Sequence, residues 1–145
     1  RADTIMQAKL NSWLAGMLSG GGPLRFDISS PWIWGAAFLN RNFAALKSFR
    51  EQGSALPVHA VEQLIAGGMQ HDVLEAAANI ICPTLLMTGD EDLLTPLHYS
   101  HELQRRIAGS RLVMLEQAGH CMFLEQPVRF AQIAADFFHE TLLKG

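Results

Sequence analysis

The chain has 145 residues, of which 49% are hydrophobic and 17% are charged, and its formal net charge is −3. This composition is typical of one globular domain and excludes a disordered segment, which would carry fewer apolar and more charged residues. Because no basic run is available to bind phosphates, no nucleic-acid partner is expected, and uncharged stretches such as residues 28–40 are too short to span a bilayer.

Only helices are predicted in the first half of the chain, because no segment alternates with a period of two. Apolar residues spaced three and four apart indicate amphipathic helices. We expect these helices over residues 3–19, from 30 to about 39, over 42–52 and over 57–66. The first should end at Gly20–Pro23 and the fourth at Gly67-Gly68, since glycine and proline interrupt helices. Ser30-Pro31 is interpreted as the start of the second helix, with a capping serine before proline.

The second half is predicted to alternate between strands and helices. After a short helix around residues 72–78, the apolar run Ile80–Gly89 is typical of a buried parallel strand. A helix from 95 to about 108, a strand over 111–115 and a final helix over 127–143 should follow. The final helix is expected to present a broad buried face, made of Val128, Phe130, Ile133, Ala134, Phe137 and Phe138.

This order of elements predicts an α/β fold with parallel strands and right-handed crossovers. Two strands are fewer than a stable parallel sheet requires, so we expect part of the sheet to be missing.

Polar clusters follow both predicted strands, at Gly89–Asp92 and at Glu116–His120. Because the carboxyl ends of parallel strands lie at one edge of a sheet, where ligands gather, we expect the two clusters to meet. A carboxylate in that place can fix the tautomer of an imidazole and stabilise the imidazolium that forms when the ring accepts a proton. Asp90, Glu91 and Asp92 are the candidate carboxylates, and His120 is the candidate base.

These segments resemble the α/β-hydrolase family. The resembling segments are Pro83–Asp92 with Thr95-Pro96, which look like the family's strand and acid turn, and Ala118–His120 with Glu125–Pro127 and Phe130, which look like its histidine loop and last helix. The resemblance implies that Asp92 is the acid of a catalytic triad and His120 its base. The order of acid before histidine is also that of the family.

The resemblance further implies that the chain is the C-terminal part of an α/β-hydrolase fold. Residues 1–71 would form the helical cap, and residues 72–145 the end of the core with its two parallel strands and flanking helices. The Gly-x-Ser-x-Gly elbow that carries the family's nucleophile is not found. Ser19 follows no predicted strand and its surrounding glycines are misplaced, so we expect the nucleophile and the oxyanion hole upstream of this chain. The chain alone is expected to be inactive.

The implied activity is that of a serine-type hydrolase, esterase-like or lactonase-like, acting on a small ester, lactone or carbon–carbon substrate without metal or organic cofactor. His120 would activate the serine, Asp92 would orient the ring, and the cap would exclude water. Cofactor-free haloperoxidases of the same fold share these motifs and remain an alternative. A non-catalytic alternative is a truncated chain that dimerises or binds through its exposed strand edge. The expected partners are a small-molecule substrate and either a second copy, as a homodimer, or the missing N-terminal half.

Trp32, Trp34 and Phe38 are candidate substrate-binding residues, because aromatic side chains in the cap could line an apolar pocket. Large apolar residues at helical spacing equally well form the core of the cap.

Four other residues have simpler interpretations than catalysis. Cys121 is interpreted as a packing thiol, and Glu125 as an anion near a helix N-terminus. His98 and His101 lie three residues apart on a helix, but no third ligand is apparent, so no metal site is expected.

The cellular setting is predicted from the cysteines and the N-terminus. Cys82 and Cys121 are interpreted as reduced thiols, since a chain this apolar needs no disulfide. The segment Arg1–Thr4 lacks the apolar stretch of a signal peptide and contains no initial methionine. A cytoplasmic protein, represented by a piece of its sequence, is therefore expected.

Overall fold

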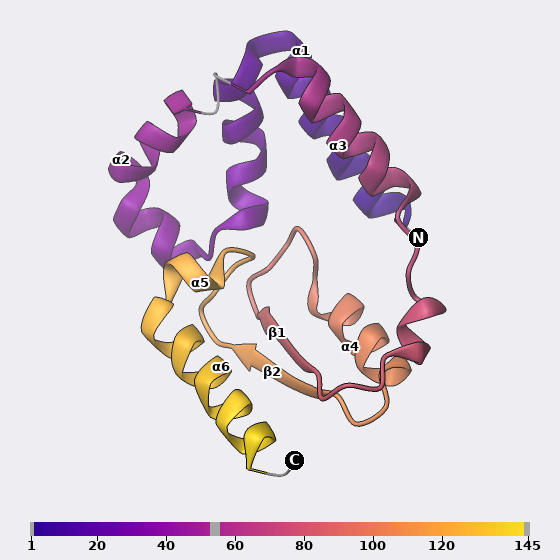
Figure 1. Ribbon diagram of the computed structural model, residues 1–145. Coiled ribbons are helices and arrows are strands. Elements are labelled where there is room, and N and C mark those ends of the chain that lie inside the picture. Colours follow the sequence, from indigo (N-terminus) through magenta and orange to yellow (C-terminus); the bar gives the residue numbers. More distant parts are fainter. Residues whose placement is uncertain (1, 53–55, 144–145) are drawn as a thin grey trace.

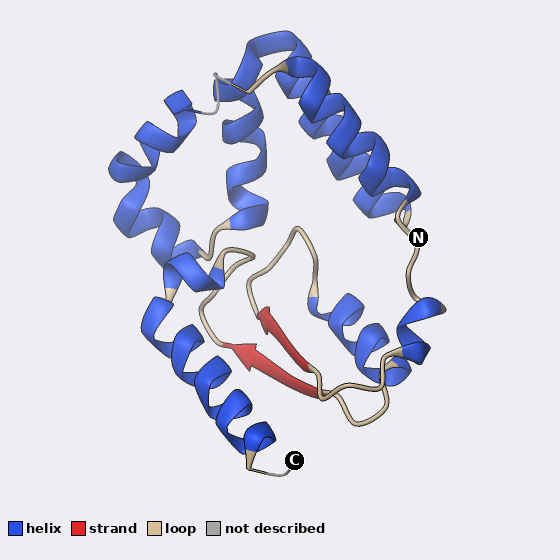
Figure 2. Cartoon of the chain, viewed as in Figure 1, coloured by secondary structure: helices blue, strands red, loops and turns tan. Residues whose placement is uncertain are grey.

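The computed structural model describes residues 2–52 and 56–143, which form a group of long helices and a small α/β unit (Figures 1 and 2). The elements, in chain order, are α1 (Thr4–Ile33), α2 (Ala36–Gln52), α3 (Val58–Gln70), the 3-10 helix η2 (Ala76–Asn79), β1 (Leu85–Gly89), α4 (Leu97–Arg106), β2 (Arg111–Leu115), α5 (Met122–Glu125) and α6 (Pro127–Leu142).

Helix α1 consists of two segments joined by a sharp bend at Gly21. The bend has φ 65° and ψ −159°, a conformation that favours glycine. The predicted interruption at Gly20–Pro23 is therefore present, but a second helical segment follows at once and continues to Ile33. In Figure 1 the bend is at the top of the view. The loops that follow β1 and β2 lie near the opposite end of the second α1 segment.

The predicted helix start at Ser30-Pro31 is wrong. Both residues lie in the last turn of α1, and the next helix begins at Ala36. The Ser30 hydroxyl donates to the Phe26 carbonyl at 2.8 Å, one turn back, instead of accepting from a downstream amide as a capping residue would. Residues 42–52, expected to be a separate helix, are the continuation of α2.

The helical part has its core between the first segment of α1 and α3, which lie side by side in Figure 1. This core contains Leu10, Met17, Val61 and Ile65, with Met6, Trp13, Leu14 and Met69 packed against it. Helix α3 does not end at Gly67-Gly68 as predicted but continues to Gln70. A Cβ atom at Gly68 would lie 3.3 Å from the Leu10 side chain, so the small residue permits close approach of the two helices.

The α/β unit contains one parallel pair of strands, as the sequence predicted. The register runs from Leu85 opposite Arg111 to Gly89 opposite Leu115, and the predicted bounds of the second strand are confirmed. The first strand is shorter than the predicted run, because residues 80–84 lie outside it and Ile81 is 97% exposed. The strands lie between α4 and α6 (Figure 1), and the core of this unit contains Leu115, Ala118 and Met122.

The broad buried face predicted for the last helix is wrong in this chain. Phe130 and Ile133 pack against the α/β core, but no residue of α6 is fully buried, and Val128 and Phe138 are 82% and 63% exposed. Among the described residues no strand pairs with the other edge of β1. The apolar pattern is present, but Val128 and Phe138, which belong to the predicted face, remain largely open to solvent.

Candidate active site

The loops that follow the two strands are joined by backbone hydrogen bonds. The Asp90 amide donates to the Leu115 carbonyl at 3.1 Å, and the Glu91 amide donates to the Ala118 carbonyl at 2.9 Å. Gly89 permits this contact, because a Cβ atom there would collide with the carbonyl oxygens of Ala118 and Gly119. The end of β1 therefore lies against the loop that carries His120.

The end of α1 contacts both loops through two carbonyl groups. The Trp32 carbonyl accepts from the amides of Leu93 (3.1 Å) and Leu94 (2.9 Å) in the acid loop, which is the loop of residues 90–96 between β1 and α4. The Ile33 carbonyl accepts from the His120 amide at 2.7 Å. The long helical segment thus fixes the position of both loops relative to each other.

Asp92 is almost fully buried, at 4% exposure, and its carboxylate is fully hydrogen-bonded. Its Oδ1 atom accepts from the amides of Leu94 (2.9 Å) and Thr95 (2.8 Å). Its Oδ2 atom accepts from the Thr95 hydroxyl at 2.7 Å. This turn places the carboxylate in one orientation, which is the requirement for aligning an imidazole.

The Nδ1 atom of His120 lies 3.0 Å from the Oδ2 atom of Asp92. The ring is partly open to solvent, with 39% of its side chain exposed. Among the described residues, the other ring nitrogen, Nε2, has no hydrogen-bond partner. A ring oriented through Nδ1 and open at Nε2 can accept a proton from a nucleophile and pass it to a leaving group.

The environment of Asp92 favours its ionised form. Burial by itself would raise the pKa of Asp92, and it is the largest single effect. The hydrogen bonds from His120 and from the amide and hydroxyl of Thr95 together outweigh burial and lower the pKa below its ordinary value. The carboxylate is therefore ionised wherever a neutral imidazole could act as a base.

The other two candidate carboxylates do not contact His120. Asp90 is exposed and accepts from the Ala118 amide at 3.3 Å. Glu91 accepts from the Ala36 amide at 2.5 Å, at the start of α2. Of the three carboxylates that the sequence left open, the structure brings Asp92 alone to the imidazole.

Two residues of this site were given no catalytic or positioning role from the sequence. Thr95 was noted in the family motif but contacts both members of the pair, with its hydroxyl 3.1 Å from His120 Nδ1. Its position three residues after an aspartate is typical of a side-chain-capped turn, which is a local signal. Glu125 contacts residues 6 and 90 positions away, Gly119 and Gly35, and only the first of these separations is short enough to suggest a contact.

Two of the three aromatic candidates, Trp32 and Trp34, lie beside the acid loop, and Phe38 lies nearer the loop that follows β2. Trp34 is 8% exposed and stacks on Phe38, with ring centroids 5.3 Å apart. Trp34 also lines a hollow of about 410 Å³ together with Asp90, Glu91 and Leu93. Trp32 is partly buried and contributes its backbone carbonyl to the acid loop. The structure therefore places Trp32 and Trp34 near the acid loop, and Phe38 against Trp34 beside a hollow that Gln117 and Glu125 also line. In the described part of the chain none of the three rings stacks on the imidazole.

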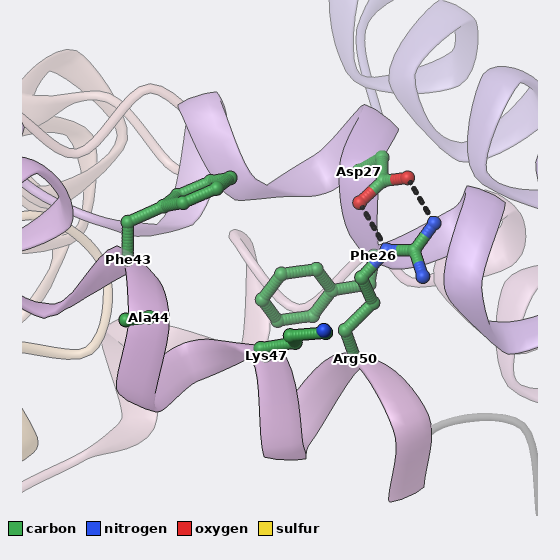
Figure 3. A pocket seen from close by; sticks show the side chains of 6 residues that line it. All are labelled: Phe26, Asp27, Phe43, Ala44, Lys47 and Arg50. Atoms are coloured by element: carbon green, nitrogen blue, oxygen red, sulfur yellow. Dashed lines mark hydrogen bonds and ion pairs between the residues drawn. The ribbon is translucent and has the colours of Figure 1, made fainter.

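A separate hollow of about 380 Å³ lies between the second segment of α1 and α2 (Figure 3). The rings of Phe26 and Phe43 form its walls, and Arg50 makes a two-pronged ion pair with Asp27 at 2.8 and 2.9 Å. None of its lining residues contacts Asp92 or His120, so it lies apart from the Asp92–His120 pair.

The remaining polar candidates are dispersed. Cys121 is partly buried, and burial, with Glu125 and Asp92 nearby, raises the pKa of its thiol to about 11, which disfavours the nucleophilic thiolate. His98 lies 3.9 Å from Asp3, and His101 is exposed. Within residues 2–52 and 56–143 no cluster of three His, Cys, Asp or Glu side chains could bind a metal.

In the same described residues no helix is both long enough and apolar enough to span a membrane.

A sequence profile described as "Alpha/beta hydrolase family" matches residues 2–133. Over 83 residues, which are 57% of its length, the chain is 34% identical to the pimeloyl-[acyl-carrier protein] methyl ester esterase of Neisseria meningitidis serogroup A. The matched region is 27% of the length of that relative. The chain spans about half the length of the similar solved structures.

Two solved structures share the fold. The α/β-hydrolase MGS-M2, from a Medee basin deep-sea metagenome library, superposes with a TM-score of 0.85 at 24% identity, covering 94% of this chain and 52% of that one. The enol-lactonase of Burkholderia xenovorans LB400 superposes with a TM-score of 0.80 at 22% identity, covering 90% of this chain and 50% of that one.

Proposed function

The chain belongs to the alpha/beta hydrolase family, and from this premise we propose that it contributes Asp92 and His120 as the acid and base of an ester-hydrolysing triad. The observation that carries the proposal is the 3.0 Å contact between Asp92 Oδ2 and His120 Nδ1. The free Nε2 atom supports it, because that atom is the one that exchanges a proton with the nucleophile in such triads.

The proposed nucleophile is a serine on an elbow in a part of the protein outside this chain. His120 would accept the serine proton as the hydroxyl oxygen attacks the ester carbonyl. It would then donate that proton to the departing alcohol, while Asp92 stabilises the transient imidazolium. Ser19 does not fit this role, because it lies within α1 near the bend and follows no strand.

We propose a small ester or lactone as the substrate class. The esterase from Neisseria meningitidis acts, by its name, on a methyl ester, and the Burkholderia xenovorans structure is that of an enol-lactonase. Both substrates have an acyl carbon that a serine can attack. Residues 1–71 would act as the cap over the site, and Trp32, Trp34 and Phe38 would contribute apolar surface to it. We further propose that the enzyme is cytoplasmic and needs no cofactor.

The exposed apolar surface of the α/β unit favours binding of a partner that adds a further strand to the sheet. Residues of α6 such as Val128 remain open to solvent, and in the described part of the chain β1 has one strand neighbour. An apolar strand edge of this kind favours pairing with another strand. We propose that the N-terminal half of the hydrolase fold covers this surface, and that a second copy of the chain does so when that half is absent.

The test is the turnover of a nitrophenyl ester by the protein that contains both this chain and the proposed serine. His120→Ala should lower kcat/KM by at least about a hundredfold, since a general base contributes that much or more. His139→Ala is the matched control, because His139 is exposed and lies on α6. Equal rates for the unmodified protein and His120→Ala would remove His120 from the mechanism.

A further inference from the structure

The carboxylate of Glu125 joins the histidine loop to the junction between α1 and α2. Its Oε2 atom accepts from the Gly119 amide at 3.1 Å and from the Gly35 amide at 3.1 Å. Gly119 directly precedes His120, and Gly35 lies between the two helices. One side chain therefore satisfies two backbone donors that come from distant parts of the sequence.

The two glycines approach each other so closely that no side chain would fit between them. A Cβ atom at Gly119 would lie 2.5 Å from the Gly35 nitrogen and would collide with the Ile33 carbonyl. A Cβ atom at Gly35 would lie 2.8 Å from the Glu125 carboxylate and 3.1 Å from the Gly119 nitrogen. The two backbones therefore lie in direct contact, and the Glu125 carboxylate accepts from both amides.

Glu125 occupies an unfavourable place for a carboxylate. Burial is the largest effect and raises its pKa, and the nearby carboxylates of Glu91 and Asp92 raise it further, while the Gly119 and Gly35 amides lower it. A carboxylate under this repulsion is a poor source of net stability. What it does provide is a fixed geometry for the residue before the base.

We propose that Glu125 is a positioning residue, whose hydrogen bonds to Gly119 and Gly35 set the orientation of the His120 ring toward Asp92. It acts through the backbone and has no contact with the imidazole. This inference rests on the proposed role of Asp92 and His120, and it assigns to the α1–α2 junction the task of aligning the base.

Nuclear magnetic resonance of the chain labelled with ¹⁵N tests the inference through two signals. The His120 Nδ1–H proton reports the hydrogen bond to Asp92, and the Gly119 amide reports the hydrogen bond to Glu125. In Glu125→Ala we expect the Gly119 amide to exchange about tenfold faster, as the loss of one hydrogen bond allows. The Nδ1–H signal should shift and broaden, because the ring is no longer held toward Asp92.

Two further variants separate positioning from general destabilisation. Glu125→Gln retains an oxygen acceptor and should recover the Nδ1–H signal, whereas a loss through charge alone would not be recovered. Glu116→Ala removes an exposed carboxylate that lines the same polar hollow as Glu125 and should leave both signals unchanged. If Glu125→Ala does not fold, Glu125→Asp, which withdraws the carboxylate by one methylene, should show the same loss.

The inference is overturned if the Nδ1–H signal of folded Glu125→Ala, or of Glu125→Asp in its place, equals that of the unmodified chain. The proposed function itself is tested by Asp92→Asn. If this substitution leaves the His120 Nδ1–H signal unchanged, the ring is not hydrogen-bonded to Asp92 and the proposed function fails. The two failures are therefore distinguishable.

Discussion

Thr95 donates its hydroxyl proton to the Oδ2 atom of Asp92 at 2.7 Å, the same oxygen that His120 Nδ1 contacts at 3.0 Å. The hydroxyl oxygen also lies 3.1 Å from Nδ1, so carboxylate, hydroxyl and imidazole form a closed triangle. The amide of the same residue bonds to Oδ1. One threonine thus fixes both carboxylate oxygens.

Replacing this hydroxyl should weaken the fold through Asp92. Thr95→Val keeps the shape and the backbone amide but removes one donor to a buried carboxylate, which should lower the free energy of unfolding by about 1.5–3 kcal/mol. Thr95→Ser keeps the donor and should lose clearly less. Urea unfolding at pH 7 measures both values, and equal losses in the two variants would show that the hydroxyl contributes nothing.

The lowered pKa of Asp92 predicts acid sensitivity. The folded pKa lies below the ordinary value of 3.8, so the contribution of Asp92 to stability is fully present above pH 3.8. It is lost as the pH falls below 3.8 and through the folded pKa, because the proton then binds the unfolded chain more tightly. Unfolding free energies measured between pH 6 and 3 should fall less steeply in Asp92→Asn. Parallel curves for the two proteins would contradict this assignment.

A pair of glycine substitutions should change stability in opposite directions. Gly119→Ala places a Cβ atom against the Ile33 carbonyl and the Gly35 nitrogen, backbone atoms that cannot yield, and should destabilise by about 1–3 kcal/mol or more. Gly67→Ala lies in α3 with nothing within 4 Å of the new atom. It should stabilise by about 0.5–1 kcal/mol through helix propensity. Thermal unfolding of both variants provides the comparison, and an unaffected Gly119→Ala would refute the close backbone contact.

The exposed apolar surface predicts self-association of the isolated chain. Sedimentation should show a dimer or larger species. The apolar side chains of α6, and the edge of β1 that has no strand neighbour among the described residues, favour contact with another copy. Phe138→Glu should weaken this association, since Phe138 is 63% exposed. Gln132→Glu, which adds the same charge at an exposed polar residue of the helix, should have little effect. A well-folded monomer at high concentration would exclude the proposed contact.

The sequence by itself determined the α/β unit and the place of Asp92 and His120 within it. An apolar run that ends in glycine, a helix and a second short run specify two parallel strands, because these signals are local. Parallel pairing then brings Gly89–Asp92 and Glu116–His120 to one edge whatever the rest of the chain does. The choice of Asp92 among three carboxylates came from resemblance, and Asp92 is the carboxylate that lies 3.0 Å from the His120 ring.

Tertiary structure alone decided the features that depend on residues far apart. Pro31 could end or begin a helix by local rules, and Gly68 could stop α3, but contacts with the rest of the chain settled both. The sequence predicted which residues form the apolar face of α6. Whether that face is buried depends on which surface is available to cover it. The bond from Glu125 to Gly35 spans 90 residues. Periodicity and spacing describe neighbours along the chain, whereas such a contact exists only once the packing of other elements has brought its two partners together.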